Sequence, residues 1–268
     1  MKKIFIYLIL CTSLISCEEV IQVDLEQSEP RLVVEASIIW FTGTAGTNQM
    51  ITLTETTPFY EDEILPVANA DVKIISEDGQ EFIFEHQQDG IYLNTNFEPV
   101  LGNAYTLEIL HDGNIYTAQE NLQGVTNLDF IEQTQTGGFS GDEIEIKAYY
   151  TDPASEENFY LFKFEREESV NLEFYEDEFT NGNQIFGYYS NENISVNDVV
   201  EIEIQGISKR YYEYLFILRS QVGSNDGGPF ETMPATVKGN IINLNNPDEY
   251  PFGYFRLSQA DSTTYIVE

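Results

Sequence analysis

The sequence predicts an all-β protein of two β-sandwich domains, the second of which carries one packed α-helix. Three observations lead to this prediction. Short stretches of alternating apolar and polar residues recur along the chain, and turn residues separate them. One segment, 207–222, has apolar residues at helical spacing instead. Hydrophobic residues make up 42% of the 268 residues, so the chain can form a packed core despite its strong charge.

Residues 1–16 have the features of a secretory signal peptide. A lysine pair and an apolar core (4–10) precede Leu14-Ile15-Ser16-Cys17, which matches the bacterial lipobox. The core is too short for a transmembrane helix, which needs about 20 apolar residues. Cleavage before Cys17 leaves this cysteine as an acylated N-terminus, and several acyl chains together form a stable anchor. A plain secretory peptide with an incidental cysteine is the alternative.

Residues 17–27 are predicted to form a lipidated tether. Glu18 and Glu19 follow the cysteine directly, and they resemble the signal that sends lipoproteins to the cell surface in the Bacteroidota. A solvated acidic leader is the alternative. We therefore expect a protein that is anchored by lipid in the outer membrane and faces the cell exterior.

The charge of the chain excludes nucleic acid as a partner. The sequence has 46 acidic and 12 basic residues, a net charge of −34, which becomes −36 without Lys2 and Lys3 of the signal peptide. Such a chain repels phosphates and also argues against a basic patch for anionic lipid, so contact with outer-membrane lipid is expected through the acyl chains. The two cysteines, Cys11 and Cys17, leave the mature chain without a disulfide or a cysteine-based metal site.

The first domain, residues 28–124, is predicted to be an Ig-like or transthyretin-like sandwich. Within it, Asp112-Gly113 is a strong hairpin signal because both central turn positions favour positive φ. Seven short alternating segments with turn residues between them support the prediction: 31–40, 50–55, 71–76, 81–86, 90–94, 104–110 and 114–119.

The second domain, residues 125–268, is predicted to be a β-sandwich with one helix. The boundary lies near residue 125 because the alternating pattern weakens there. Ser208 is a suitable N-cap for the helix, whose apolar face is expected to pack on the sheet, and a helix that binds a groove in a partner is the alternative. The last two predicted strands, 253–258 and 263–267, are expected to pair with each other. The other predicted strands are 144–150, 159–164, 169–179, 184–190 and 198–206.

No motif indicates an enzyme. His86 and His111 have no partner at metal-ligand spacing, and a surface position at a turn is expected for each. The sequence lacks a serine-hydrolase elbow, a phosphate loop and a dinucleotide fingerprint. We therefore predict no catalytic residue, no metal site and no cofactor. A hydrolase that uses paired carboxylates is a remote alternative, because acidic residues are abundant.

Two local features have a functional alternative. Glu176-Asp177-Glu178 with Asn181 and Asn183 could bind Ca²⁺ through a flexible loop, although a solvated acidic loop is the favoured interpretation. Trp40-Phe41 beside a Gly/Thr loop (42–47) could stack on a sugar, but the end of a core strand is favoured.

Several stretches together resemble one family, number 4249 among the domains of unknown function, a set of Bacteroidota outer-membrane lipoproteins. These stretches are 17–21, 29–38, 207–218, 228–241 and 253–258. The first half also resembles a carboxypeptidase-regulatory or transthyretin-like Ig module, through residues 89–92 and 102–105. The family pattern is matched at Cys17, Pro30, Val33, Val34, Glu35, Ile207, Ser208, Lys209, Pro229, Phe230, Pro234, Val237, Gly239, Asn240, Ile241, Gly253, Tyr254 and Phe255.

The resemblance implies a partner. Lipoproteins of this family are often encoded beside TonB-dependent outer-membrane receptors, so we expect a non-enzymatic surface lipoprotein that binds such a receptor. Residues 223–252 are the expected contact surface, because loops on a rigid scaffold carry most recognition. Pro229, Phe230, Pro234 and Asn240 are the candidate partner-binding residues. The alternatives are a structural or assembly component of a larger outer-membrane complex, in which the chain is an Ig-like spacer, and the carboxylate-based hydrolase.

Overall fold

The computed structural model describes residues 29–58, 63–138, 141–222 and 236–268. Within these ranges it has sixteen strands, β1 to β16, and one helix, α2. The predicted mostly-β class with one helix is confirmed. No helix in the described part is long and apolar enough to cross a membrane.

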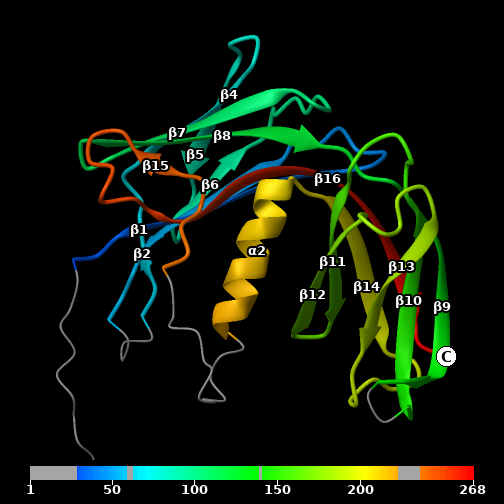
Figure 1. The fold of residues 1–268 in the computed structure, drawn as a ribbon. Helices are drawn as coiled ribbons and strands as arrows, with labels where there is room; N and C mark the ends of the chain where they lie inside the picture. Colours follow the sequence, from blue (N-terminus) through cyan, green and yellow to red (C-terminus); the bar gives the residue numbers. More distant parts are fainter. Residues whose placement is uncertain (1–28, 59–62, 139–140, 223–235) are drawn as a thin grey trace, which may run out of the picture.

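Eight strands close into a mixed barrel around the larger core (Figure 1). Around the barrel they follow the order β16-β1-β2-β6-β5-β4-β7-β8, and β8 pairs again with β16. The β1–β16 and β8–β16 pairings are parallel and the others are antiparallel. The bounds are β1 (Leu32–Phe41), β2 (Gln49–Glu55), β4 (Asp71–Ser76), β5 (Glu81–His86), β6 (Ile91–Asn94), β7 (Ala104–His111), β8 (Asn114–Gln123) and β16 (Phe252–Ile266).

The barrel corrects the sandwich that the sequence predicted for residues 28–124. Two sheets do face each other, but they join at both edges, through β5–β6 on one side and through β16 on the other. The closing strand comes from the far end of the chain. It covers the edges of β1 and β8, which would otherwise expose unpaired backbone groups.

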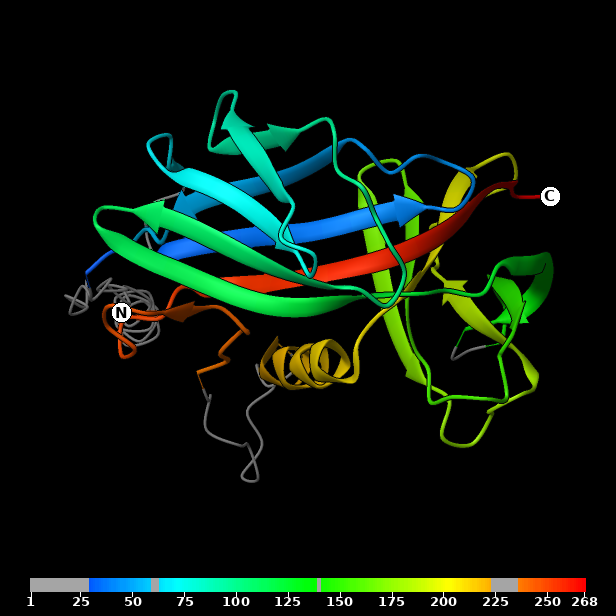
Figure 2. The ribbon, with the colours of Figure 1, turned by 90° about the horizontal axis from the view of Figure 1, so that it is seen from above.

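A second correction concerns β16 itself. The sequence predicted two paired strands at 253–258 and 263–267, whereas residues 252–266 form one continuous strand. Ala260 pairs with Phe41 of β1 on one side and with Gln205 of β14 (Val199–Gly206) on the other, so the chain stays extended where a turn was expected. Figure 2 shows β16 running beside β1 and continuing into the second group of strands.

The second core lies between two sheets. The strands β12 (Ser169–Glu176), β11 (Phe159–Arg166), β14 and the end of β16 face the small sheet of β13 (Gln184–Ser190), β10 (Glu143–Thr151) and β9 (Leu128–Gly137). Gly187 allows the sheets to approach, because a Cβ there would lie 2.7 Å from the ring of Phe162. The second core therefore contains strands that are hydrogen-bonded to the barrel through β16.

The helix α2 (Lys209–Val222) begins where the sequence predicts it. The Ser208 hydroxyl accepts the backbone N–H of Tyr211 at 3.3 Å, which is the expected N-cap. Its first half packs on Phe159 and Leu161 of β11 through Tyr211, Tyr212 and Leu215. The predicted packing of the helix on the sheet is confirmed for this half.

Candidate partner-binding surface

The outer face of one barrel sheet is the candidate functional surface. This sheet runs in the order β5-β4-β7-β8, and β15 (Ile242–Asn243) pairs at its edge. Alternation along each strand decides which side chains face outward. In β7, Leu107 and Ile109 are buried in the barrel core, so Leu110, which is 42% exposed, lies on the outer face.

Apolar side chains from three strands meet on this face. Leu110 pairs with Ile115 of β8, and the N–H of Leu244 donates to the carbonyl of Ile115 at 2.8 Å. Ile242 lies in the next row, opposite Thr117. Leu244 is 56% exposed and Ile242 is 53% exposed. We call Leu110, Ile115, Ile242 and Leu244 the outer apolar patch.

Asparagines hold the segment that presents Leu244. The Asn245 side-chain oxygen accepts the N–H of Ile115 at 2.8 Å. Asn243 is buried, and its side-chain oxygen accepts the backbone N–H of Asn245 at 3.0 Å and that of Asn246 at 3.1 Å. Two exposed apolar side chains are thus fixed by polar contacts within the fold, which reduces the entropy that a partner must remove on binding.

A charged cleft adjoins the patch. Lys73 of β4 lies between Glu81 and Glu108, with its Nζ 2.9 Å and 3.2 Å from their carboxylate oxygens. Hydrogen bonds to these two carboxylates raise the pKa of Lys73, which therefore stays charged. Lys73, Glu108, Leu110, Ile83 and His86 are among the residues that line a cleft of about 590 Å³ on the outer face.

The structure corrects the role expected for Asn240. This residue is only 4% exposed, and its side-chain amide donates to the carbonyl of Phe255 at 2.7 Å and accepts the N–H of Phe255 at 2.9 Å. Both hydrogen bonds join the Asn240 side chain to the backbone of β16, as in the pairing of two adjacent strands. The side chain is therefore not accessible to a partner. The other candidate residues, Pro229, Phe230 and Pro234, lie outside the described residues.

Sequence reasoning missed the residues that do face solvent. Ile242 and Leu244 fall within the predicted contact segment 223–252, but neither was singled out. The signal was present in the stretch Asn240-Ile241-Ile242-Asn243-Leu244, where two apolar residues flank an asparagine. Such asparagines fix short turns, so the apolar residues beside them are held at the surface.

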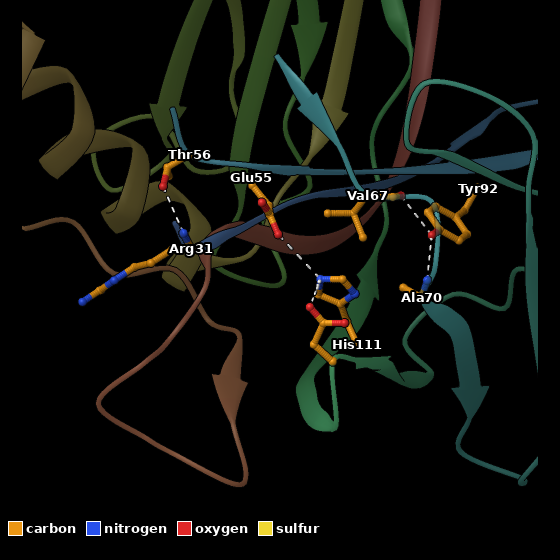
Figure 3. Close-up of polar contacts among 8 residues, drawn as sticks. Arg31, Glu55, Thr56, Val67, Ala70, Tyr92 and His111 are labelled. Atoms are coloured by element: carbon orange, nitrogen blue, oxygen red, sulfur yellow. Dashed lines mark hydrogen bonds and ion pairs between the residues drawn. The ribbon is translucent and has the colours of Figure 1, made fainter. Parts of the chain in front are cut away.

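The two histidines lie in different environments. His86 ends β5 and is exposed. His111 was expected on the surface, but it is only 7% exposed and lies at one end of the barrel (Figure 3). Its Nε2 is 3.8 Å from Glu55 and 3.6 Å from Asp112. The correction follows from alternation along β7, which directs position 111 into the barrel.

Backbone groups at the same end of the barrel are satisfied by side chains (Figure 3). The Tyr92 hydroxyl donates to the carbonyl of Val67 at 3.0 Å and accepts the N–H of Ala70 at 3.0 Å. The N–H of Arg31 donates to the Thr56 hydroxyl at 3.0 Å. Burial raises the pKa of Tyr92, so its hydroxyl remains a donor. These side chains thus pair backbone groups that lie outside the strand pairings.

The acidic loop considered for Ca²⁺ uses its buried carboxylate within the fold. Asp177 is 3% exposed and accepts the backbone N–H of Asn158 at 2.9 Å. Asn181 donates to the carbonyl of Glu156 at 3.2 Å. In the part of the chain that the structure describes, no three His, Cys, Asp or Glu side chains are placed to hold a metal ion together.

Two carboxyl groups with raised pKa values lie on different strands. Burial raises the pKa of Glu120 on β8 and of Glu203 on β14. Each is held by its own neighbour: Glu120 accepts the Ser208 hydroxyl at 3.3 Å, and Glu203 accepts the side-chain amide of Gln205. Both carboxyl groups therefore have polar partners within the fold.

Comparison with known proteins identifies one family. The model described as "Domain of unknown function (DUF4249)" matches residues 18–264. Among the curated proteins, none matches this sequence.

Three solved structures show a distant likeness. A two-domain fibronectin type III segment of chicken tenascin is 13% identical, with 66% of this chain and 90% of that chain covered and a TM-score of 0.22. A cytokine receptor complex is 6% identical, with 68% and 86% covered and a TM-score of 0.26. A DUF4785 family protein from Legionella pneumophila is 11% identical, with 68% and 54% covered and a TM-score of 0.25. Superpositions this poor carry no conclusion about the chain.

Proposed function

The chain belongs to the DUF4249 family, and from that premise we propose that it is a surface-exposed outer-membrane lipoprotein that binds a TonB-dependent receptor and catalyses no reaction. The outer apolar patch carries the binding part of this proposal. Three of its side chains come from the adjacent strands β7, β8 and β15 and the fourth, Leu244, directly follows β15; two of the four are more than half exposed. Apolar residues that gather in this way on a soluble surface mark interaction sites.

The edge of the sheet adds a second means of recognition. β15 is the last strand in its sheet order and has only two residues. An edge strand offers backbone groups to a partner strand, and the side chains beside it give specificity. We propose that an extended segment of the receptor pairs along β15 and covers Ile242 and Leu244.

The membrane anchor of this proposal is Cys17, with residues 17–27 as the tether. The supporting observation is the lipobox at residues 14–17.

The test is a pull-down of the acylated protein from native outer membranes, followed by mass spectrometry. The parent protein should recover a TonB-dependent receptor in stoichiometric yield. The variant Ile242→Ser/Leu244→Ser should lose the receptor and keep the thermal unfolding of the parent. The matched control is Val199→Ser/Ile266→Ser, a cross-strand pair that is 48% and 59% exposed in the second half of the chain.

The outcomes separate the hypotheses. Undiminished receptor recovery with the Ile242/Leu244 variant contradicts the proposed surface. Recovery of assembly or secretion machinery in place of a receptor identifies a structural component of a larger complex.

A further inference from the structure

The outer face of the small sheet carries a row of aromatic side chains. Phe130 of β9 pairs with Tyr149 of β10, which pairs on its other side with Phe186 of β13. Alternation along β10 places Ala148 and Tyr150 in the second core, so Tyr149 and its two partners face outward. Figures 1 and 2 show this sheet at one end of the molecule, with the barrel and α2 away from its outer side.

The packing of the row leaves one ring face of Phe130 free. The ring centroids of Phe130 and Tyr149 lie 4.5 Å apart with their planes 15° apart, so one face of Phe130 is stacked. Phe186 contacts Tyr149 from the other side at 5.1 Å, and the Lys147 Nζ lies 4.9 Å from the centre of the Phe186 ring. Since β9 is the last strand of its sheet and Phe130 is 47% exposed, the second face of this ring is open to solvent.

A polar cluster follows the aromatic row across the same three strands. One carboxylate oxygen of Asp129, Oδ2, accepts the Thr151 hydroxyl at 2.7 Å and the Gln184 side-chain amide at 2.7 Å. Thr151 and Gln184 lie opposite each other, two positions from Tyr149 and Phe186, so the cluster shares the outer face with the rings. The second Asp129 oxygen and the Gln184 side-chain oxygen are acceptors that this cluster does not use.

A β-bulge brings Asp129 to this face beside Phe130. The register shifts between Tyr149 and Tyr150, whose partners on β9 are Phe130 and Leu128. Asp129 is the extra residue between these partners, so two successive side chains, one charged and one aromatic, face outward. Bulges occur next to functional sites, where they change the direction of a side chain. The bulge therefore sets an apolar ring face beside a group that accepts hydrogen bonds.

This combination matches the chemistry of a sugar ring. A pyranose with equatorial hydroxyls has C–H groups on both faces and hydroxyls around its rim. C–H groups next to oxygen carry partial positive charge, and the face of an aromatic ring carries partial negative charge, so the two attract. The hydroxyls donate to the free acceptors of Asp129 and Gln184.

The size and charge of the face disfavour a protein partner. Phe130, about half exposed, offers on the order of 100 Å² of apolar surface, whereas a stable protein interface buries about 800 Å² on each side. A cationic partner is the other chemistry that a ring beside a carboxylate attracts. The chain supplies its own cation on this face, because Lys147 lies over Phe186 and is 3.1 Å from Glu145.

We propose that the outer face of the small sheet binds a glycan of equatorially substituted pyranose rings, such as a β-1,4-linked glucose chain. One sugar ring stacks on the free face of Phe130, and its hydroxyls donate to Asp129 and Gln184. The outer apolar patch lies on the barrel, on other strands. The glycan site is therefore separate from the proposed receptor contact and does not depend on it.

The test is isothermal titration of the full acylated protein with cellohexaose, in a polyoxyethylene detergent that has no sugar headgroup. Phe130→Ala removes the stacking ring. Phe130→Leu, which keeps an apolar side chain on the sheet, replaces this variant if it fails to fold. Asp129→Ala removes the acceptor. The matched control is Phe216→Ala, because Phe216 is 61% exposed on α2. Thermal unfolding checks the fold of each variant, and hexa-arginine serves as the cationic probe.

The parent should bind cellohexaose at one site. Either Phe130 variant should raise the Kd about tenfold or more, as the loss of an aromatic stacking partner does for nucleic-acid bases. Asp129→Ala should raise the Kd several-fold, and Phe216→Ala should leave it unchanged. A parent that does not bind cellohexaose would overturn the inference, and so would an unchanged Kd in a folded Phe130 variant. Binding of hexa-arginine alone, lost in the Phe130 variant, would assign the face to a cationic partner and refute the glycan.

Discussion

Replacement of Gly253 by alanine tests how β16 closes the barrel. Gly253 pairs with Val34 of β1 and has a φ of +98°, a conformation that side chains with a Cβ rarely adopt. A Cβ at this position would lie 2.0 Å from the carbonyl oxygen of Val34. Gly239 crosses on the other side, where its own Cβ would lie 1.7 Å from the carbonyl oxygen of Gly253. Backbone therefore approaches Gly253 from two directions.

The expected cost has two parts. The positive φ costs about 1–2 kcal/mol for a residue with a Cβ. Relief of the contact with Val34 requires a shift of β1 against β16, which we place at about 1–3 kcal/mol by analogy with overpacked cores. Gly253→Ala should therefore lower the free energy of unfolding by about 2–5 kcal/mol. This is a large share of the ~5–15 kcal/mol that holds a typical domain.

The assay is urea unfolding of the chain without its signal peptide, followed by circular dichroism. Gly113→Ala is the matched control, because Gly113 has a φ of +78° and no atom within 4 Å of an added Cβ. In the control, the free energy of unfolding should fall only by the contribution of the positive φ, about 1–2 kcal/mol. Equal unfolding midpoints for the two variants would refute the close approach of β1 and β16 as the reason for glycine at position 253.

Two further predictions concern buried polar groups. Burial raises the pKa of Glu120 above its unfolded value of about 4.3. The ionised side chain therefore lowers the free energy of unfolding, and this loss develops as the pH rises from the unfolded pKa through the raised pKa of the folded state. Glu120→Gln can still accept hydrogen bonds from Ser208 and Tyr254. This variant should gain stability relative to the parent as the pH is raised through that range. A difference in urea unfolding midpoint that does not change with pH would contradict this. Tyr160 donates to the buried carboxylate of Asp152 at 2.6 Å. Tyr160→Phe should therefore cost about 1.5–3 kcal/mol in urea unfolding, and a cost below 0.5 kcal/mol would show that the carboxylate finds another donor.

Features that depend on residues close together in the chain, such as a turn or a helix start, could be predicted from the sequence. The Asp112-Gly113 hairpin is confirmed, with φ values of +47° and +78° at the two turn positions and His111 paired with Asn114. Few residues tolerate two successive positive φ angles, so the Asp-Gly dipeptide by itself indicates this turn. The helix start at Ser208 follows from the same kind of rule, since its hydroxyl satisfies an N–H within the next turn.

The candidate surface lies partly within a segment that the sequence analysis singled out, and its role in binding stays a prediction. The segment 223–252 was expected to carry the contact, and Ile242 and Leu244 lie within it. Asn240 was chosen as a partner-binding residue and is buried, because an asparagine in a polar stretch can form hydrogen bonds with a neighbouring strand as well as with solvent. Whether Asn240 faces solvent or binds a strand depends on the position of β16 in the fold. β16 begins at Phe252, outside the local stretch from which Asn240 was chosen.

The sequence by itself determined the signal peptide prediction, the acidic character, the strand periods, the hairpin and the helix, all of which depend on residues close together in the chain. Tertiary structure alone decided that residues 252–266 form one strand and that this strand is shared by both cores. Backbone pairing has nearly the same energy for any two strands of suitable length, so the partner is selected by packing across the whole fold. A pairing between positions 34 and 253 leaves no local pattern in either segment, and only the folded chain shows it.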